Sequence, residues 1–210
     1  MKRTPARKKS AAKSKPAVPA ARAVPAPSRP VRSFSRPAPG SPSPAKGAWH
    51  FPVRKPGERW YWLLKQEPTD FSFDDMWEPA RTTNWNGVRN FAARNFLRDH
   101  MKVGDQALFY HSNADPSAVV GVVEIVREAY PDESALDGAS PYHDPKATRD
   151  APIWYQVGVR AIEKFARPVS LAEIKRLPGL GTMVLLHISQ LSVQPVTAKE
   201  WDAITALGRA

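Results

Sequence analysis

The sequence predicts an α+β fold, a small mixed β-barrel flanked by helices, that follows a disordered basic tail. Three observations predict it. Residues 1–58 are dominated by Lys, Pro, Ala and Ser, whereas residues 59–210 have the mixed composition of a folded domain. Within the domain, apolar runs of strand length alternate with short helical patterns. The strand-like runs are mostly candidates for antiparallel pairing, and they are too few for a β-sandwich.

The tail carries almost all of the net positive charge. Residues 1–58 hold 14 Lys and Arg against one acid, a net of +13, whereas residues 59–210 hold 17 against 19, a net of −2. The tail also holds 12 of the 22 prolines. Such a segment cannot bury enough apolar surface to offset its ordering entropy, so we expect it to be disordered and extended. A basic arm favours nucleic acid as partner over a solubilising tail or a targeting signal.

Composition also excludes several classes of protein. Cysteine is absent, which removes disulfides, thiolate zinc sites and cysteine nucleophiles. The absence of cysteine also indicates an intracellular location, with a bacterial cytoplasm favoured, or the nucleus in a eukaryote. No apolar run approaches 18 residues, so no membrane partner is expected. The five histidines lack metal-ligand spacing and no phosphate-binding glycine motif occurs, so we expect neither a metal nor a cofactor.

The first half of the domain is predicted to be a strand, a short helix, a loop and a longer helix. Residues 60–66, WYWLLKQ, lack helical period and indicate a buried strand. Ser72 with Asp75 resembles a capping box for the short helix that follows. Residues 81–87 are predicted to be a loop. From Val88 the apolar period becomes helical and predicts a helix over about 88–100.

The second half is predicted to be richer in strands. Residues 106–112 and 119–130 are rich in β-branched and aromatic side chains and should form an antiparallel pair. Residues 131–152 form a long polar loop, of a length that usually indicates function or flexibility. Residues 153–165 predict a further strand.

The C-terminal part is predicted to contain two capped helices. Capping boxes open a short helix at Ser170 and the last helix at Thr197. Between them, residues 183–188 suit either a strand or a helical turn, and residues 191–196 are short and extended.

The first candidate site is the stretch NWNGVRN at residues 84–90. Trp85 is either a core residue or a half-buried platform whose free ring face stacks on a base. Gly87 permits a positive φ or a close approach of another group. Arg89 and Asn90 are placed in the first turn of the predicted helix, where backbone N–H groups attract phosphate. The alternative for Arg89 is a surface salt bridge.

The second candidate is YHSN at residues 110–113, at the end of a predicted strand. Alternation sends Tyr110 and Ser112 to one face and His111 and Asn113 to the other, so one pair can line the mouth of the barrel. His111 suits three roles: a general base, a donor to a ligand, or a structural histidine.

Lys65 and Glu67 form a third candidate, because they lie two residues apart near the end of the first strand and share a face. A buried pair there is costly unless it is hydrogen-bonded. The two side chains could orient a ligand, tie the strand to residues 84–90, or form a proton-transfer pair.

Six motifs in order carry a resemblance to a known family. They are YWLLKQEP, NWNGVRNFAARNFLR, LFYHSN, EAYPD, YHDPKA and LSVQPVTAKEW, and together they resemble the EVE domain family over about residues 60–207. The resemblance implies a PUA-like fold related to the YTH and ASCH domains. It also implies non-catalytic recognition of a modified base, with modified cytosine in DNA favoured over RNA. We expect the protein to be a monomer.

Matching positions with the family places the pocket on twelve residues. These are Lys65, Ser72, Trp85, Asn86, Gly87, Val88, Arg89, Asn90, Tyr110, His111, Ser112 and Asn113. The recurrence of NWNGVRN beside these motifs favours the platform interpretation for its loop, with Trp85 as wall or floor of the pocket. One position departs from the pattern, since members of the family often have Arg directly before LSVQP and this chain has Gln190.

Two other functions remain open. Some ASCH relatives resemble small amidohydrolases, and Lys65, Glu67 and Ser72 could serve such a reaction on modified nucleosides. Alternatively, the chain is a protein-interaction module whose proline-rich tail docks partners.

Overall fold

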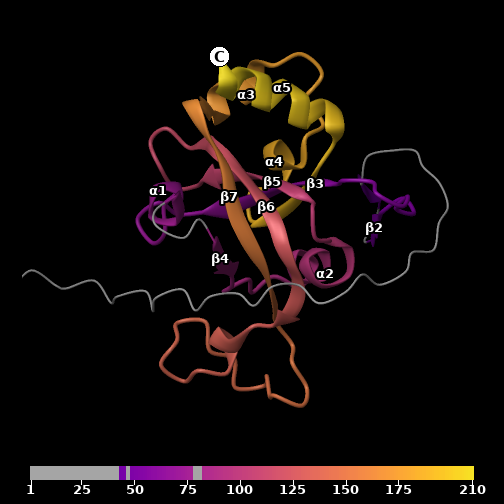
Figure 1. The fold of residues 1–210 in the computed structure, drawn as a ribbon, viewed down its shortest axis with the longest axis vertical. Coiled ribbons are helices and arrows are strands. Elements are labelled where there is room, and N and C mark those ends of the chain that lie inside the picture. Colours follow the sequence, from indigo (N-terminus) through magenta and orange to yellow (C-terminus); the bar gives the residue numbers. More distant parts are fainter. Residues whose placement is uncertain (1–42, 46–47, 78–81) are drawn as a thin grey trace, which may run out of the picture.

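The computed structural model describes residues 43–45, 48–77 and 82–210 (Figure 1). Most of the predicted tail, residues 1–42 and 46–47, therefore lies outside the described residues. The described part is built on a six-stranded mixed β-sheet with short helices around it, which confirms the predicted fold class. A separate antiparallel pair consists of β1 (Ser43–Ala45) and β2 (Ala48–His50).

Six strands form the main sheet in the order β4-β7-β6-β5-β3-β8. They are β3 (Tyr61–Gln66), β4 (Thr82–Trp85), β5 (Gln106–His111), β6 (Ala118–Pro131), β7 (Tyr155–Ser170) and β8 (Val193–Val196). The pairing of β3 with β5 is parallel, and the other neighbours are antiparallel, including the predicted pair β5 and β6. β6 and β7 form a long hairpin whose connecting loop projects beyond the sheet (Figure 1).

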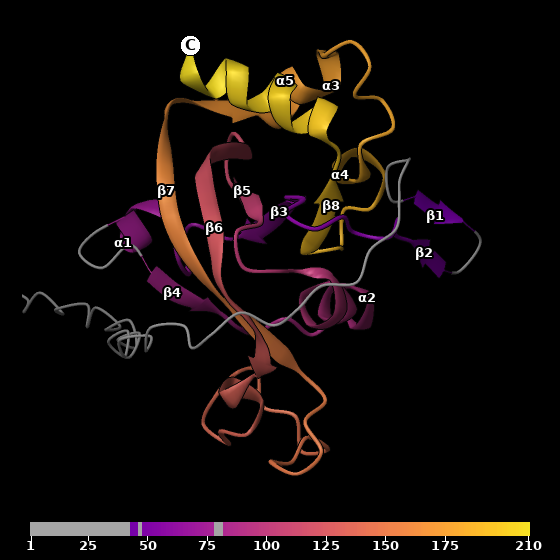
Figure 2. The ribbon, with the colours of Figure 1, turned by 45° about the vertical axis from the view of Figure 1, so that its right-hand side comes forward.

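The helices are short and lie around the sheet. They are α1 (Phe73–Trp77), α2 (Phe91–Asn95) with a π-helical turn (Phe96–His100), a 3-10 turn (Glu133–Ala135), α3 (Leu171–Arg176), α4 (Val184–His187) and α5 (Ala198–Arg209). In Figure 2, α3 and α5 lie together at one end of β6 and β7, and the loop that joins these strands lies at the other end.

The predicted capping interactions are confirmed. Ser170 and Thr197 each form a complete capping box with a glutamate three residues later. At α1, the Ser72 hydroxyl accepts a hydrogen bond from the Asp75 N–H (3.1 Å), and the Asp75 carboxylate accepts one from the Ser72 N–H (2.8 Å). Local rules predict these helix starts well because the capping partners are only three residues apart.

Two elements differ from the prediction. Residues 82–85, expected in a loop, form β4 at the edge of the sheet, because pairing with β7 overrides their polar composition. The helix expected from Val88 begins at Phe91. Gly87 has a φ of +75°, outside the helical region, and the Asn90 side chain caps the helix by accepting hydrogen bonds from two backbone N–H groups. Arg89 and Asn90 are therefore not in a first helical turn.

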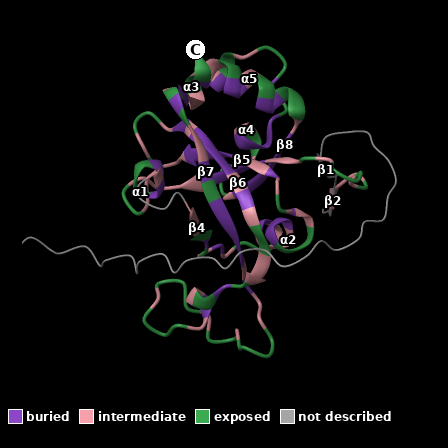
Figure 3. Ribbon diagram, viewed as in Figure 1, coloured by how far each residue is buried: buried purple, intermediate pink, exposed green. Residues whose placement is uncertain are grey.

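The core has two parts, which take alternate residues of the same strands. Figure 3 shows buried residues along the long strands β6 and β7. Trp62 and Leu64 of β3 belong to one cluster together with Phe109 of β5 and Phe96. Leu63 belongs to the other, against α3 and α5. Because β3 is buried on both faces, its sequence is a continuous apolar run, as expected for such a strand.

Part of the predicted tail packs against the domain. The Trp49 ring lies edge-on to Phe96, with centroids 5.0 Å apart, and Phe51 stacks on His100 at 3.9 Å. Arg54 forms an ion pair of 2.6 Å with Asp105, whose side chain is 1% exposed. Trp49, Phe51 and Arg54 therefore contact the domain, although the sequence assigns residues 1–58 to the tail. The average composition of the tail did not reveal that Trp49 and Phe51 near its end are packing residues.

Candidate functional site

A pocket of about 310 Å³ lies where β3 and β5 end. It is lined by Lys65, Gln66, Glu67, Asp70, Ser112, Asn113, Tyr142, Ser189, Gln190 and Ser192. Every one of these side chains carries a hydrogen-bonding group, so the pocket suits a ligand with several donors and acceptors. Three of the twelve residues predicted for the site line it: Lys65, Ser112 and Asn113.

Backbone hydrogen bonds bring the lining segments together. The parallel pairing of β3 and β5 places Gln66 beside His111, and the Ser112 N–H donates to the Gln66 carbonyl at 2.9 Å. On the other side of β3, the Lys65 N–H donates to the Ser192 carbonyl at 2.8 Å. The pocket therefore has a rigid base on the sheet.

Lys65 is the cation of the pocket floor. Its Nζ donates to the Ser189 carbonyl at 2.8 Å and lies 5.9 Å from the centroid of the Tyr110 ring. Burial of the amine lowers the pKa of Lys65 to about 8. Its expected partner Glu67 instead accepts a hydrogen bond from the Asn113 amide at 2.6 Å. Lys65 and Glu67 both line the pocket, and each is held by a hydrogen bond to a different lining residue.

The YHSN segment does not present two alternating faces. β5 ends at His111, and Asn113 has a φ of +51°, so Ser112 and Asn113 both turn to the pocket. Tyr110 is 4% exposed and belongs to the core. His111 Nε2 accepts a hydrogen bond from the Phe73 N–H at 3.1 Å, so the ring is neutral, and burial lowers its pKa. His111 is a structural residue that ties β5 to α1.

Trp85 is a core residue. Its side chain is 5% exposed, and its ring lies edge-on to Phe109 with centroids 5.4 Å apart. In this structure the indole therefore has no free face for stacking, unlike the half-buried platform that was predicted. The cause is the unpredicted strand β4: its pairing with β7 at the edge of the sheet directs the Trp85 side chain into the core, against Phe109 of β5.

Tyr142 provides the exposed ring at the pocket instead. It belongs to the 131–152 loop, is 39% exposed and lines the pocket. Its ring covers Gly87 so closely that a Cβ at that position would lie 3.0 Å from it. Gly87 thus shows both features expected of it, a positive φ and a close approach. Composition and periodicity gave no signal for this tyrosine, although it is the first residue of the motif YHDPKA.

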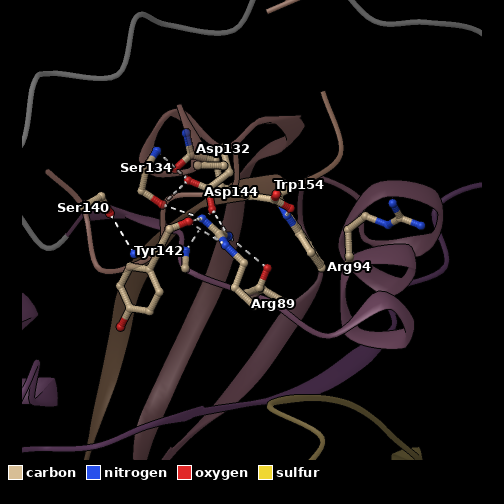
Figure 4. A network of polar contacts seen from close by, with 12 residues as sticks. Arg89, Arg94, Asp132, Ser134, Ser140, Tyr142, Asp144 and Trp154 are labelled. Carbon is tan, nitrogen blue, oxygen red and sulfur yellow. Dashed lines mark hydrogen bonds and ion pairs between the residues drawn. The ribbon is translucent and has the colours of Figure 1, made fainter. Parts of the chain in front are cut away.

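Arg89 holds the 131–152 loop, which carries Tyr142, in place by hydrogen bonds (Figure 4). Its Nε donates to the Tyr142 carbonyl at 2.8 Å, and Nη1 donates to Asp132 Oδ2 at 2.8 Å and to the Val88 carbonyl at 3.1 Å. Nη2 donates to Ser134 Oγ at 3.2 Å and also to the Tyr142 carbonyl. All five N–H donors are thus used within the protein. The expected phosphate contact of Arg89 is not supported by this geometry.

Asp132 is the buried centre of this network. Its side chain is 0% exposed and accepts further hydrogen bonds from the Gly87 N–H at 3.0 Å and from Ser134, whose N–H and hydroxyl lie at 2.9 and 2.7 Å. The network therefore joins residues 84–90 to the loop. The geometry of the loop base was not visible in the sequence, because Gly87 and Arg89 lie more than 40 positions from Asp132.

The remaining predicted residues lie outside the pocket lining. Ser72 and Asn90 cap α1 and α2. Val88 is 5% exposed, and Asn86 is exposed. In the described ranges, no cluster of three His, Asp or Glu side chains could hold a metal ion. Nor is any helix of the described residues both long and apolar enough to cross a membrane.

Comparison with known proteins gives consistent matches. The EVE domain pattern matches residues 60–207. Human thymocyte nuclear protein 1 is 39% identical over 165 residues, which cover 70% of this chain and 73% of that protein. The crystal structure of human THYN1 in complex with DNA containing 5-methylcytosine matches with a TM-score of 0.68 and 38% identity, over 72% of this chain and 99% of that one. A hypothetical protein from Leishmania major matches with a TM-score of 0.70 and 44% identity, over 73% and 97%.

Proposed function

We propose that this chain, which belongs to the EVE domain family, is a non-catalytic DNA-binding protein that accepts one modified cytosine in the pocket beside Tyr142. The observation that carries the proposal is the pocket itself, which has a volume of about 310 Å³, is lined by side chains that each carry a hydrogen-bonding group, and is bordered by an exposed aromatic ring. Its volume falls at the lower end of small-ligand sites, which span roughly 300–1,000 Å³. The human relative solved with 5-methylcytosine DNA supports this choice of ligand.

The lining suggests how a base would be held. Ser112, Asn113 and Gln190 offer donors and acceptors to the edge of a base, while the Tyr142 ring offers a face. One such stack contributes about 1–3 kcal/mol, and taking the base out of a duplex costs a few kcal/mol. A methyl group adds only about 0.8 kcal/mol on burial, which is roughly fourfold in affinity. We therefore expect preference for the modified base to be modest unless a hydrogen bond also reads it.

The proposal is tested by titrating the full chain with matched oligonucleotides. The set contains DNA and RNA, single-stranded and duplex, with cytosine, 5-methylcytosine or 5-hydroxymethylcytosine at one position. We expect the modified DNA to bind most tightly. Equal affinity for every member of the set would contradict the proposal.

Tyr142→Ala is expected to weaken binding of the preferred oligonucleotide by roughly 5- to 150-fold, because one base–aromatic stack is lost. Fluorescence anisotropy measures the change. Tyr142→Phe keeps the ring and is the matched control, with affinity close to that of the wild type. If both variants bind like the wild type, the Tyr142 ring does not contact the base.

Affinity is expected to fall as the pH rises from 7 to 9, because the pKa of Lys65 is about 8 and the charged amine is the form that donates into the pocket. The sign follows from lysine being protonated below its pKa and neutral above it. The measurement is a binding titration across this range. Lys65→Met should bind more weakly at pH 7 and lose this pH dependence; a variant with the wild-type profile would assign the titration to another group.

The basic tail is proposed to add affinity for the DNA backbone without sequence preference. Residues 1–42 hold 11 Lys and Arg and no acid. If about six of these charges neutralise phosphates, log K should fall against log salt with a slope near −5. Removal of residues 1–42 should flatten the slope and leave base preference unchanged, because residues 49–58, which pack on the domain, are kept. An unchanged slope would contradict the proposal that residues 1–42 bind the DNA backbone.

One observation favours a second function. Lys65, with a pKa of about 8, shares the pocket with Glu67, which suits acid–base chemistry on an acylated nucleoside. Ser72, the third residue considered for such a reaction, caps α1 and does not line the pocket. Incubation of the protein with acylated or alkylated nucleosides separates the two functions, since turnover would identify an amidohydrolase and binding without turnover a reader.

A further inference from the structure

A row of alternating rings and guanidinium groups runs from the pocket rim to α2. The Arg89 guanidinium lies 5.6 Å from the Tyr142 ring centroid and 5.3 Å from that of Trp154. Trp154 stacks on Phe91 with centroids 5.0 Å apart and an interplanar angle of 25°, and the Arg94 guanidinium lies 4.9 Å from the Phe91 ring. Figure 4 shows Trp154 between Arg89 and Arg94.

Phe91 is the open end of this row. Its side chain is 60% exposed, whereas Trp154 beneath it is 6% exposed. Trp154 is also fixed in place, because its indole N–H donates to Asp144 at 2.6 Å. Single exposed apolar residues are ordinary on protein surfaces. Phe91 differs in that a buried ring supports it and a cation lies beside it.

Arg94 keeps its charge available. Its Nε donates to the Asn95 side chain and its Nη1 to the Ile153 carbonyl, both at 2.9 Å and both neutral acceptors. No carboxylate of the described residues forms an ion pair with Arg94. The nearby carboxylate of Asp99 forms its ion pair with Arg98, at 2.7 Å. Arginine has five N–H donors, so further donors remain for an anion such as a phosphate.

We propose that Phe91 and Arg94 form a second contact for the DNA strand whose modified base occupies the pocket: Phe91 stacks on a flanking base, and Arg94 binds the adjacent phosphate. This rests on the proposed function. A ring beside a guanidinium is the usual combination for stacking on bases while neutralising the backbone. The three steps from the Tyr142 ring to Phe91 span at most about 16 Å, less than five nucleotide steps of about 3.4 Å.

Ligand length provides the test. A modified deoxynucleoside occupies the pocket alone, whereas a single-stranded oligonucleotide of twelve nucleotides with the modified base at its centre also reaches Phe91. For Phe91→Ala in the full chain, we expect the affinity for the oligonucleotide to fall by roughly 5- to 150-fold. The affinity for the nucleoside should stay within about twofold, because the pocket is unchanged. Phe91→Tyr should bind like the wild type.

Two further variants sharpen the result. Arg94→Met should weaken oligonucleotide binding and reduce the salt slope by about 1, as loss of one phosphate contact requires. Val103→Ala removes another exposed apolar side chain, 54% exposed, and should change nothing. Oligonucleotide affinity that is unaffected by Phe91→Ala, or an equal loss for both ligands, would overturn the second contact. If the wild-type chain binds neither ligand, the proposed function fails as well.

Discussion

An Arg89→Met variant is expected to lose on the order of 3 kcal/mol of the free energy of unfolding, because it leaves the buried Asp132 carboxylate without its cation. The Asp132 side chain is 0% exposed and lies 2.8 Å from Arg89 Nη1. Methionine has nearly the length of the arginine stem but cannot donate any of the five hydrogen bonds that Arg89 makes. Urea denaturation followed by circular dichroism measures the loss.

Two controls isolate the cause. Lys102→Met removes an ion pair with Glu128 whose side chains are 43% and 49% exposed, so its effect should stay within about 1 kcal/mol. Adding Asp132→Asn to Arg89→Met removes the uncompensated charge and should recover part of the lost stability. If Arg89→Met behaves like Lys102→Met, the network does not stabilise the fold.

Ligand binding should change in the same variant for a separate reason. The Tyr142 carbonyl accepts two hydrogen bonds from Arg89, so the variant frees the segment that places the Tyr142 ring at the pocket. Under native conditions, the variant should therefore bind the modified oligonucleotide more weakly, in the direction of Tyr142→Ala. Such a result would make Arg89 a positioning residue, which acts through the placement of Tyr142.

The elements that the sequence predicted well have strong local signals. β3 is a continuous apolar run, β6 is rich in β-branched residues, and α3 and α5 begin at capping boxes whose partners are three residues apart. β4 was missed because its hydrogen bonds come from β7, more than 70 positions away. The helix start was placed three residues early, because the apolar period continues through Val88 even though Asn90 caps the helix.

The residues of the candidate site likewise fall into those that the sequence indicated and those that it did not. Lys65, Ser112 and Asn113 were found because they stand at the ends of predictable strands, where a parallel pair brings them together. Tyr142 and Asp132 lie in the quoted motifs YHDPKA and EAYPD but were not chosen as site residues, because a long polar loop gives no sign of how it folds back on Gly87. Motif recurrence pointed to NWNGVRN, whose Gly87 and Arg89 contact Tyr142 at the pocket. It did not indicate which ring of that region is exposed.

Trp85→Ala is expected to cost about 3–5 kcal/mol of stability, because it removes a large buried ring and leaves a cavity against Phe109. The platform interpretation of the sequence predicts the opposite pattern, a loss of ligand affinity with little change in stability. Trp85→Phe keeps an aromatic ring and should cost clearly less. Denaturant unfolding of both variants, measured beside Tyr142→Ala, separates the two interpretations.

Tyr142→Ala should show the complementary pattern, since its side chain is 39% exposed against 5% for Trp85. We expect it to unfold close to the wild type while binding weakly. If Trp85→Ala instead folds with wild-type stability and fails to bind, the indole must turn out of the core when DNA is present, and the stacking role would pass from Tyr142 back to Trp85. The pair of variants therefore assigns the stack to one ring, because loss of a buried ring lowers stability, whereas loss of an exposed ring that contacts the ligand lowers affinity.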